Sequence, residues 1–311
     1  MVESEIHQPV LVQEVSIALG CRLGGKKVYL DCTVGMGGHA EVILNATEPE
    51  GRVIGIDRDE DALALAAERL SRFQNRVTLR KSPFMELLHV VTDLGVKEVD
   101  GILFDLGVSS LQLDRPERGF SFQRPGPLDM RMDRTEGESA ADWINSASER
   151  ELVRILQEYG EERWSKRIAS AIVRHRSESG TISRTEALEE IIWKAVPAKD
   201  RHRRIHPATR TFQALRMVIN QEIPQLEAGL KEAISLLAVG GRLVVISFHS
   251  LEDRLVKQTF RAWSRGEVAE KEGSARCFVN LYKKPVRPGE AEIARNPRAR
   301  SAKLRALERV A

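Results

Sequence analysis

The sequence is poor in cysteine, and its few cysteines stand far apart. The 311 residues include only Cys21, Cys32 and Cys277, and no two of them form a C-x-x-C pair. This count and spacing support neither a disulfide framework nor a zinc site, so we expect no bound metal. They are typical of a protein from a reducing compartment.

A targeting signal and a membrane-spanning segment are also missing. The first ten residues, MVESEIHQPV, contain neither a basic region nor an apolar core, so we expect no secretory signal. No apolar run approaches the roughly 20 residues that a membrane helix needs. The net charge is only +3, so the total charge says little about partners. We expect a cytoplasmic protein that does not bind membranes.

Short apolar segments alternate with helical patterns over the first hundred residues. The segments at 27–33, 51–57, 75–81 and 98–107 predict buried strands. Residues 58–73 have apolar side chains at helical spacing and acidic side chains at their start, where the helix dipole favours them. This alternation predicts an α/β fold, with a parallel sheet and right-handed crossovers.

The pattern of alternation is then interrupted. The next convincing strand is 240–248, whereas a crossover needs only about a dozen residues. The intervening segment opens with a loop rich in Gly, Pro, Asp and Arg and continues with helical patterns at 140–160, 162–177 and 184–196. We therefore predict a helical domain, residues 110–216, inserted into a discontinuous α/β domain of residues 1–109 and 217–311.

Three glycines follow the first predicted strand, in the stretch DCTVGMGGH. Open α/β sheets bind ligands at the carboxyl ends of their strands, and Gly35, Gly37 and Gly38 would let the backbone approach a ligand closely there. Asp57 ends the second predicted strand, where it can accept hydrogen bonds from ribose hydroxyls. The pattern indicates an adenosine-containing cofactor. A structural turn with a surface acid is the alternative, because glycine patterns alone give many false positives.

The turn does not by itself distinguish a dinucleotide from S-adenosylmethionine. The dinucleotide fingerprint is G-x-G-x-x-G, and Ala40 in the last place is a permitted variant. Asp31, however, would repel a pyrophosphate and suits a cofactor that carries a sulfonium and an ammonium group. An NAD-dependent oxidoreductase remains the alternative enzyme.

Asp105 ends the fourth predicted strand, beside the expected ligand. Amino-group methyltransferases often carry Asp, Asn or Ser here, followed by two prolines and an aromatic residue. Oxygen acceptors at this place bind the target NH2 and leave the nitrogen lone pair facing the methyl group. Leu106, Gly107 and Val108 follow Asp105, so the prolines and the aromatic residue are missing. Capping of a following helix is an equal alternative for Asp105.

Six sequence blocks, in order, resemble the bacterial 16S ribosomal RNA cytosine-N4 methyltransferase family. They are DCTVGMGGHAEVIL, DGILFDLGVSSLQLDRPERGFSF, GPLDMRMD, HPATRTFQALR, ISFHSLEDR and NPRARSAKLR. The resemblance covers essentially the whole chain. It implies a class I methyltransferase fold with an inserted helical domain and S-adenosylmethionine as methyl donor. The implied substrate is a cytidine in the decoding region of 16S rRNA, within the small ribosomal subunit.

The same resemblance implies the site residues. It assigns cofactor contacts to Gly37, Gly38, His39, Asp57, Phe84, Asp105 and Gln112. Phe84 is expected against the adenine, and His39 is expected to shape the pocket. Asp105 is the expected catalytic residue, holding the target amine, and no general base is assigned. An RNA-binding assembly factor without turnover is the non-enzymatic alternative, and the oligomeric state, a homodimer included, is left open.

Basic clusters predict where RNA phosphates bind. One cluster, 199–210, contains Arg203, Arg204 and Arg210, which we expect to contact the substrate. The second is the C-terminal segment 282–309.

The third cluster is the loop from Arg115 to Arg134, where arginines are interleaved with Phe120 and Phe122. An aromatic residue after Asp105 is missing, so Phe120 or Phe122 is expected to stack on the target base. Core packing is the alternative for both.

Two polar residues follow the fifth predicted strand, at the same edge of the sheet. Ser250, with Asp253 three residues later, predicts a helix cap. His249 is kept as a candidate contact of the target base. His7 has no chemical partner in the sequence, and we expect it to be structural or to face RNA.

Overall fold

The chain divides into two compact units. The computed structural model describes residues 9–267 and 277–311, so His7 lies outside the described residues. Unit 1 comprises Met1–Gly107 and Gln225–Ala311, and unit 2 comprises Val108–Pro224. The boundary expected after residue 216 falls inside helix α11 (Ala208–Ile219), because that helix continues and the chain leaves unit 2 only after Pro224. Among the described helices, none combines the length and the apolar character needed to cross a bilayer.

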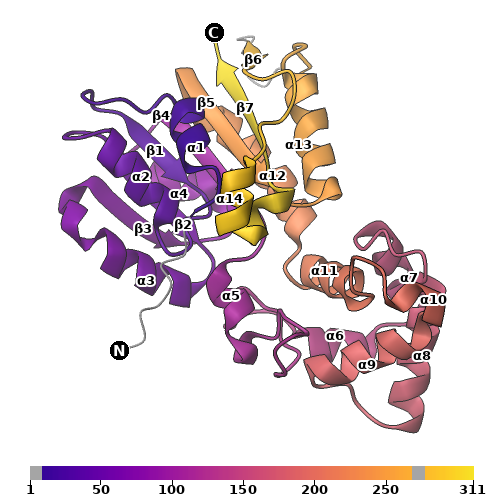
Figure 1. The fold of residues 1–311 in the computed structure, drawn as a ribbon. Coiled ribbons are helices and arrows are strands. Elements are labelled where there is room, and N and C mark those ends of the chain that lie inside the picture. The colour runs from indigo at the N-terminus through magenta and orange to yellow at the C-terminus, as the bar shows by residue number, and fades with distance from the viewer. Residues whose placement is uncertain (1–8, 268–276) are drawn as a thin grey trace. The chain divides into compact units, whose positions relative to one another are not determined.

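Unit 1 is built on a seven-stranded sheet (Figure 1). Its strands lie in the order β3-β2-β1-β4-β5-β7-β6. Strands β1 to β5 are parallel, and β7 is antiparallel to both of its neighbours. The strand bounds are β1 Val28–Asp31, β2 Arg52–Asp57, β3 Val77–Lys81, β4 Val99–Asp105, β5 Leu237–Ser247, β6 Phe278–Asn280 and β7 Lys303–Arg309.

Helices cover both faces of this sheet, which explains why its strands are apolar almost throughout. On one face, α1, α2 and α3 bury their apolar sides in a core with β1, β2 and β5. On the other face, α4, α12 and α13 enclose a second core. The bounds are α1 Val12–Leu19, α2 Gly38–Ala46, α3 Glu60–Leu70, α4 Leu87–Asp93, α12 Glu222–Leu236, α13 Ser250–Trp263 and α14 Glu290–Arg295.

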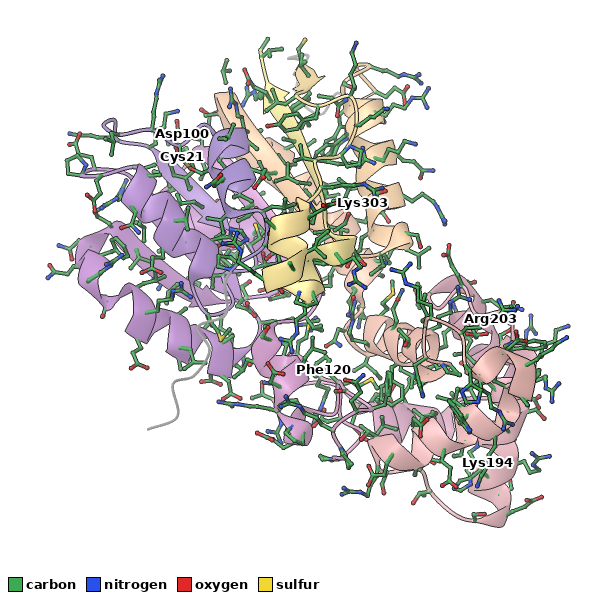
Figure 2. All side chains as sticks on the ribbon, viewed as in Figure 1. Cys21, Asp100, Phe120, Lys194, Arg203 and Lys303 are labelled. Atoms are coloured by element: carbon green, nitrogen blue, oxygen red, sulfur yellow. The ribbon has the colours of Figure 1, made fainter. Side chains whose placement is uncertain are left out.

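Strands β6 and β7 had no counterpart among the predicted elements. The basic residues of β7 are largely used within unit 1. Lys303, labelled in Figure 2, lies 2.8 Å from a carboxylate oxygen of Asp253 on α13. Arg305 lies 2.8 Å from the other oxygen of Asp253, and Arg309 lies 3.1 Å from Glu98. These cations neutralise acids of their own unit, and RNA binding by the second basic cluster stays a prediction.

Unit 2 is helical around one core. Ser139 and Ser148 open α6 and α7 with reciprocal capping boxes, and Ser148 thereby splits the helical pattern predicted over 140–160. The bounds are α5 Ser110–Asp114, α6 Ala140–Ser146, α7 Glu149–Glu158, α8 Ser165–Glu178, α9 Thr185–Ala195, α10 Ala198–Arg201 and α11 Ala208–Ile219. The buried faces of α6 to α9 and α11 meet in this core.

Candidate active site

Three acids end three neighbouring strands of unit 1. Asp31 ends β1, the middle one of these three strands, and Asp57 and Asp105 end β2 and β4 on either side of it. The chain runs from β1 through β2 to β3 on one side of the sheet and from β4 to β5 on the other. The switch point therefore lies at the end of β1, where open α/β sheets bind their ligands.

The glycine turn follows directly from β1. Gly35 and Gly37 have φ values of 51° and 82°, the left-handed conformation that glycine adopts most easily. Gly37 N–H donates to the carbonyl of Val34 at 2.7 Å. A Cβ on Gly38, the first residue of α2, would lie 3.1 Å from Pro9. The glycines thus serve the turn and its packing, and they also leave bare backbone at the edge of the sheet.

Asp57 braces this turn. Its Oδ2 accepts from Gly35 N–H and its Oδ1 from Asp59 N–H, each at 2.9 Å. Burial raises the pKa of Asp57 to about 6, although both hydrogen bonds act to lower it. Each carboxylate oxygen can accept a second hydrogen bond, so Asp57 retains capacity for the hydroxyls of a ligand.

Asp31 is the most deeply buried of the three acids, at 1% exposure. Its Oδ1 accepts from Thr33 N–H at 3.2 Å, whereas its Oδ2 is buried and has no hydrogen-bond partner among the described residues. Burial raises the pKa of Asp31 to about 7, against the opposing effect of His39. A buried acceptor without a partner is costly, so this oxygen suits a cationic group of a ligand.

Asp105 is in contact with a buried histidine. His39, the second residue of α2, is 5% exposed, and its Nε2 lies 3.4 Å from Asp105 Oδ2. Burial alone would lower the pKa of His39, but the carboxylates of Asp105 and Asp31 raise it above its ordinary value. Asp105 N–H donates to Thr33 Oγ1 at 2.6 Å, which fixes the backbone at the end of β4.

The other oxygen of Asp105 is available. Asp105 Oδ1 and both ring nitrogens of His39 are buried without a hydrogen-bond partner in the described part of the chain, so the approach of Nε2 to Oδ2 is an ion-pair contact. The next helix, α5, is capped by Ser109 and not by Asp105. Asp105 therefore does not cap the following helix, and its Oδ1 is a buried acceptor without a partner among the described residues.

Phe84 lies just after β3, in the same unit. Its ring meets Phe104 edge to face, with 5.3 Å between centroids. A Cβ on Gly229 of α12 would lie 2.8 Å from the Cβ of Phe84, so this glycine lets the helix pack against it. Phe84 is only partly buried, which leaves part of its ring for a flat ligand.

Comparison with known proteins gives the family. The model of the MraW methylase family matches residues 4–310, nearly the whole chain. This chain belongs to the MraW methylase family. It is 52% identical over 310 residues to ribosomal RNA small subunit methyltransferase H of Geobacter sp. strain M21, covering 98% of each chain. It is 50% identical over 307 residues to the protein of that name from Symbiobacterium thermophilum, covering 97% and 96%. The expected class I methyltransferase fold is thereby confirmed.

Gln112 lies in unit 2, where it has a structural task. It is buried, and its Oε1 accepts from Ser109 N–H at 3.1 Å while Ser109 Oγ accepts from Gln112 N–H. This capping box opens α5. A cofactor contact of Gln112, as implied by the resemblance to the cytosine-N4 methyltransferase family, stays a prediction.

The cap of α13 differs from the one predicted. His249, not Ser250, is the N-cap, and its Nδ1 accepts from Glu252 N–H at 3.5 Å. Glu252 Oε2 in turn accepts from Phe248 N–H at 2.9 Å. The expectation for Ser250 was wrong by one residue, because Glu252, not Asp253, completes the box. The capping role of His249 accounts for its position without a substrate.

The predicted stacking residues of this MraW protein are largely internal to unit 2. Phe120 is 7% exposed within the core (Figure 2), which favours the packing alternative. Phe122 stacks on His206 at 4.7 Å and meets Phe212 edge to face at 5.2 Å. Arg118 of the same loop is 1% exposed and donates to two backbone carbonyls, so it holds the loop and cannot reach RNA as it stands.

The arginines of the first basic cluster meet at one place. Arg203, Arg204 and Arg210 line a hollow of about 380 Å³, together with Trp164 and His206. Arg203 lies 2.6 Å from the buried carboxylate of Asp200. Arg210 donates to the carbonyl of residue 161 at 3.2 Å. Contacts within unit 2 therefore position two of these arginines, and the cluster remains a candidate RNA contact.

Proposed function

We propose that this chain transfers a methyl group from S-adenosylmethionine to the N4 amine of a cytidine in 16S rRNA. The relatives that are about half identical to it carry the name of a small-subunit ribosomal RNA methyltransferase, which supports the reaction and the RNA. The observation that carries the chemistry is Asp105, a strand-end carboxylate with one oxygen against His39 and the other unpartnered.

Finer details belong to the same proposal. The substrate is the RNA of the small ribosomal subunit, and the protein acts in the cytoplasm, where such particles are made. A homodimer is compatible with this site but not required by it. Asp31, His39, Asp57, Phe84 and Asp105 all belong to unit 1 of one chain.

The residues of unit 1 fit the methyl donor. The unpartnered Asp31 Oδ2 suits a cationic group, and Asp57 retains lone pairs for ribose hydroxyls. The backbone of Gly37 and Gly38 supplies close approach, and Phe84 offers a ring face or edge for adenine. When bound, S-adenosylmethionine supplies an electrophilic methyl group on a sulfonium.

Asp105 activates the cytosine amine that accepts the methyl group. The lone pair of the cytosine amine is delocalised into the ring, so the amine is a poor nucleophile. Asp105 Oδ1, accepting from an amine N–H, draws the lone pair out of conjugation and stabilises the positive charge that grows on nitrogen. The nitrogen then sheds one proton, for which the same oxygen is an acceptor. His39 Nε2 lies 3.4 Å from the other oxygen and, when protonated, attracts it electrostatically.

The decisive experiment is methylation of purified small subunits, with mass spectrometry of the nucleosides. We expect N4-methylcytidine with the wild-type protein. Asp105→Ala should lower the rate at saturating cofactor roughly 10²–10³-fold, the usual effect of removing one preorganised group at a reacting centre. A wild-type preparation that produces no N4-methylcytidine would end the proposal, and an Asp105→Ala rate close to wild type would remove Asp105 from it.

A further inference from the structure

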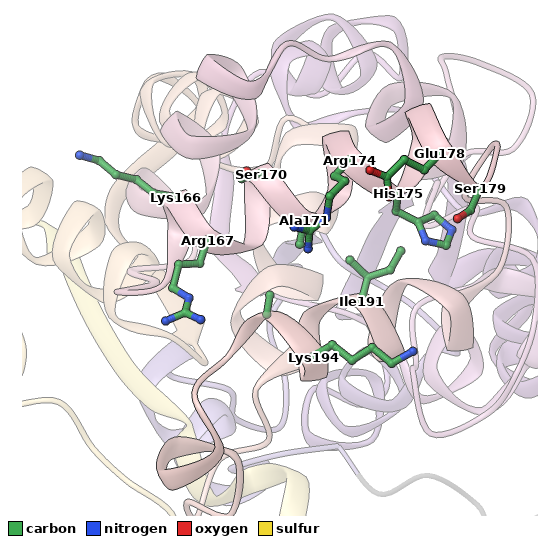
Figure 3. Close-up of a pocket in the computed structure, with 11 residues that line it drawn as sticks. Lys166, Arg167, Ser170, Ala171, Arg174, His175, Glu178, Ser179, Ile191 and Lys194 are labelled. Carbon is green, nitrogen blue, oxygen red and sulfur yellow. The ribbon is translucent and has the colours of Figure 1, made fainter.

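Unit 2 carries a second hollow, distinct from the one around Arg203. It lies between α8 and α9 and has a volume of about 490 Å³ (Figure 3). Its lining includes four permanently cationic side chains and one carboxylate, Glu178. The four cations are Lys166, Arg167, Arg174 and Lys194. We call this hollow the α8–α9 groove.

The groove has a floor of small residues and a cationic rim. Ser170 and Ala171 lie on α8 between Arg167 and Arg174 (Figure 3). Arg167 and Arg174 are two helical turns apart, which corresponds to about 10 Å along the axis. Lys194 faces them from α9. A narrow, charged ligand can therefore lie on the small residues while cations contact it from both helices.

These cations are poorly neutralised by the protein. Lys194 pairs with Glu190 one turn earlier, but both side chains are exposed, and such pairs are weak. Lys166 and Arg174 have no ion pair within residues 9–267 and 277–311. Arg167 lies 5.8 Å from the ring of Trp164, an interaction that leaves its N–H groups available. A helix face that only served solubility would normally interleave acids with these cations.

We propose that the α8–α9 groove binds the phosphodiester backbone of the RNA substrate, away from the reacting base. The inference rests on the proposed function and deepens it. Arginine and lysine are the usual partners of phosphate oxygens, and the Ser170 hydroxyl adds a neutral donor. Among the described residues, no Phe, Tyr or Trp lines the groove; His175 supplies its one imidazole ring and Ile191 is its one large apolar residue, so the lining offers far more cations for phosphate than surface for base stacking or for an apolar peptide. Binding in the groove is therefore independent of RNA sequence.

The test is salt-dependent binding of 16S rRNA by the full chain. Neutralising Arg167 and Arg174 together, as Arg167→Ala with Arg174→Ala, should lower affinity severalfold or more at low salt. It should reduce the slope of log K against log salt by about 0.7–0.9 for each phosphate that the protein no longer neutralises. In methylation assays KM for small subunits should rise while kcat is unchanged. Both side chains are exposed, so the fold should survive, and circular dichroism checks this.

A matched control removes two exposed cations outside the groove. Arg150→Ala with Lys257→Ala changes the net charge equally and should leave the salt slope near wild type. An unchanged slope in the groove variant, or an equal change in the control, would overturn the proposal. If KM for small subunits rises while binding of naked rRNA is unchanged, an acidic protein surface is the partner and the RNA assignment fails. Absence of N4-methylcytidine with wild type would count against the reaction and not against the groove.

Discussion

Asp31 combines deep burial with an unpartnered oxygen, and this makes its charge sensitive to pH. Because burial raises its pKa to about 7, the carboxyl is largely neutral at pH 6 and largely ionised at pH 8. The ionised form is the one that attracts a cation. Asp31 thus couples the protonation of the free protein to the capture of a positively charged cofactor.

We predict that S-adenosylmethionine binds more tightly as pH rises from 6 to 8. The dissociation constant should fall by up to about tenfold for each pH unit below the pKa of Asp31 and level off above it. Isothermal titration calorimetry at several pH values measures this. Asp31→Asn should weaken binding at pH 8 and flatten the profile. His39 faces the same cluster and, when protonated, would repel the cation, so a profile that persists in Asp31→Asn would assign the effect to His39.

At the scale of elements, substitutions at the N-cap of α13 can distinguish a structural role of His249 from a role in binding the substrate. His249→Ala removes a side chain that accepts a backbone N–H, and it should lower the free energy of unfolding by roughly 0.5–2 kcal/mol. His249→Asn provides another good N-cap and should restore stability. Urea unfolding measures both. If His249→Asn is as stable as wild type but inactive, then His249 contacts the substrate as well.

The parallel strands were predictable because each combines an apolar run with a clear end. The predictions at 51–57 and 75–81 contain β2 and β3 within one or two residues. Strand β7 was not predictable in the same way. Its sequence, KLRALER, has alternating apolar residues but also helical spacing, and its cations pair with Asp253 and Glu98, which are distant in sequence.

The candidate site shows the same division. Acids at strand ends follow from the alternation of strands and helices, so Asp31, Asp57 and Asp105 were expected at one edge. The contact of His39 with Asp105 joins α2 to the end of β4, and no local pattern reveals it. Buried arginines are equally hidden. From the sequence, Arg118 is expected to be a surface cation, because the carbonyls that accept its hydrogen bonds come close to it only when the loop folds.

At the scale of the whole molecule, cofactor binding should stabilise the two units unequally. The proposed contacts of S-adenosylmethionine lie mainly in unit 1, whereas unit 2 has its own core. At a ligand concentration 100 times the dissociation constant, the stabilisation is about 2.7 kcal/mol. Hydrogen exchange should therefore slow in β1, α2 and β4 and change little in α7 to α9. Equal protection of both cores would show that the units unfold together.

The insertion of unit 2 between β4 and β5 has a consequence for the synthesis of the protein. Residues 1–107 leave the ribosome first, all of unit 2 follows, and only then do β5 and β7 emerge. Until that moment β4 presents an open edge, a surface on which nascent chains can aggregate. The helical unit can meanwhile collapse around its own core. The order of synthesis thus leaves an incomplete sheet exposed in the cell while a separate domain is synthesised between two of its strands.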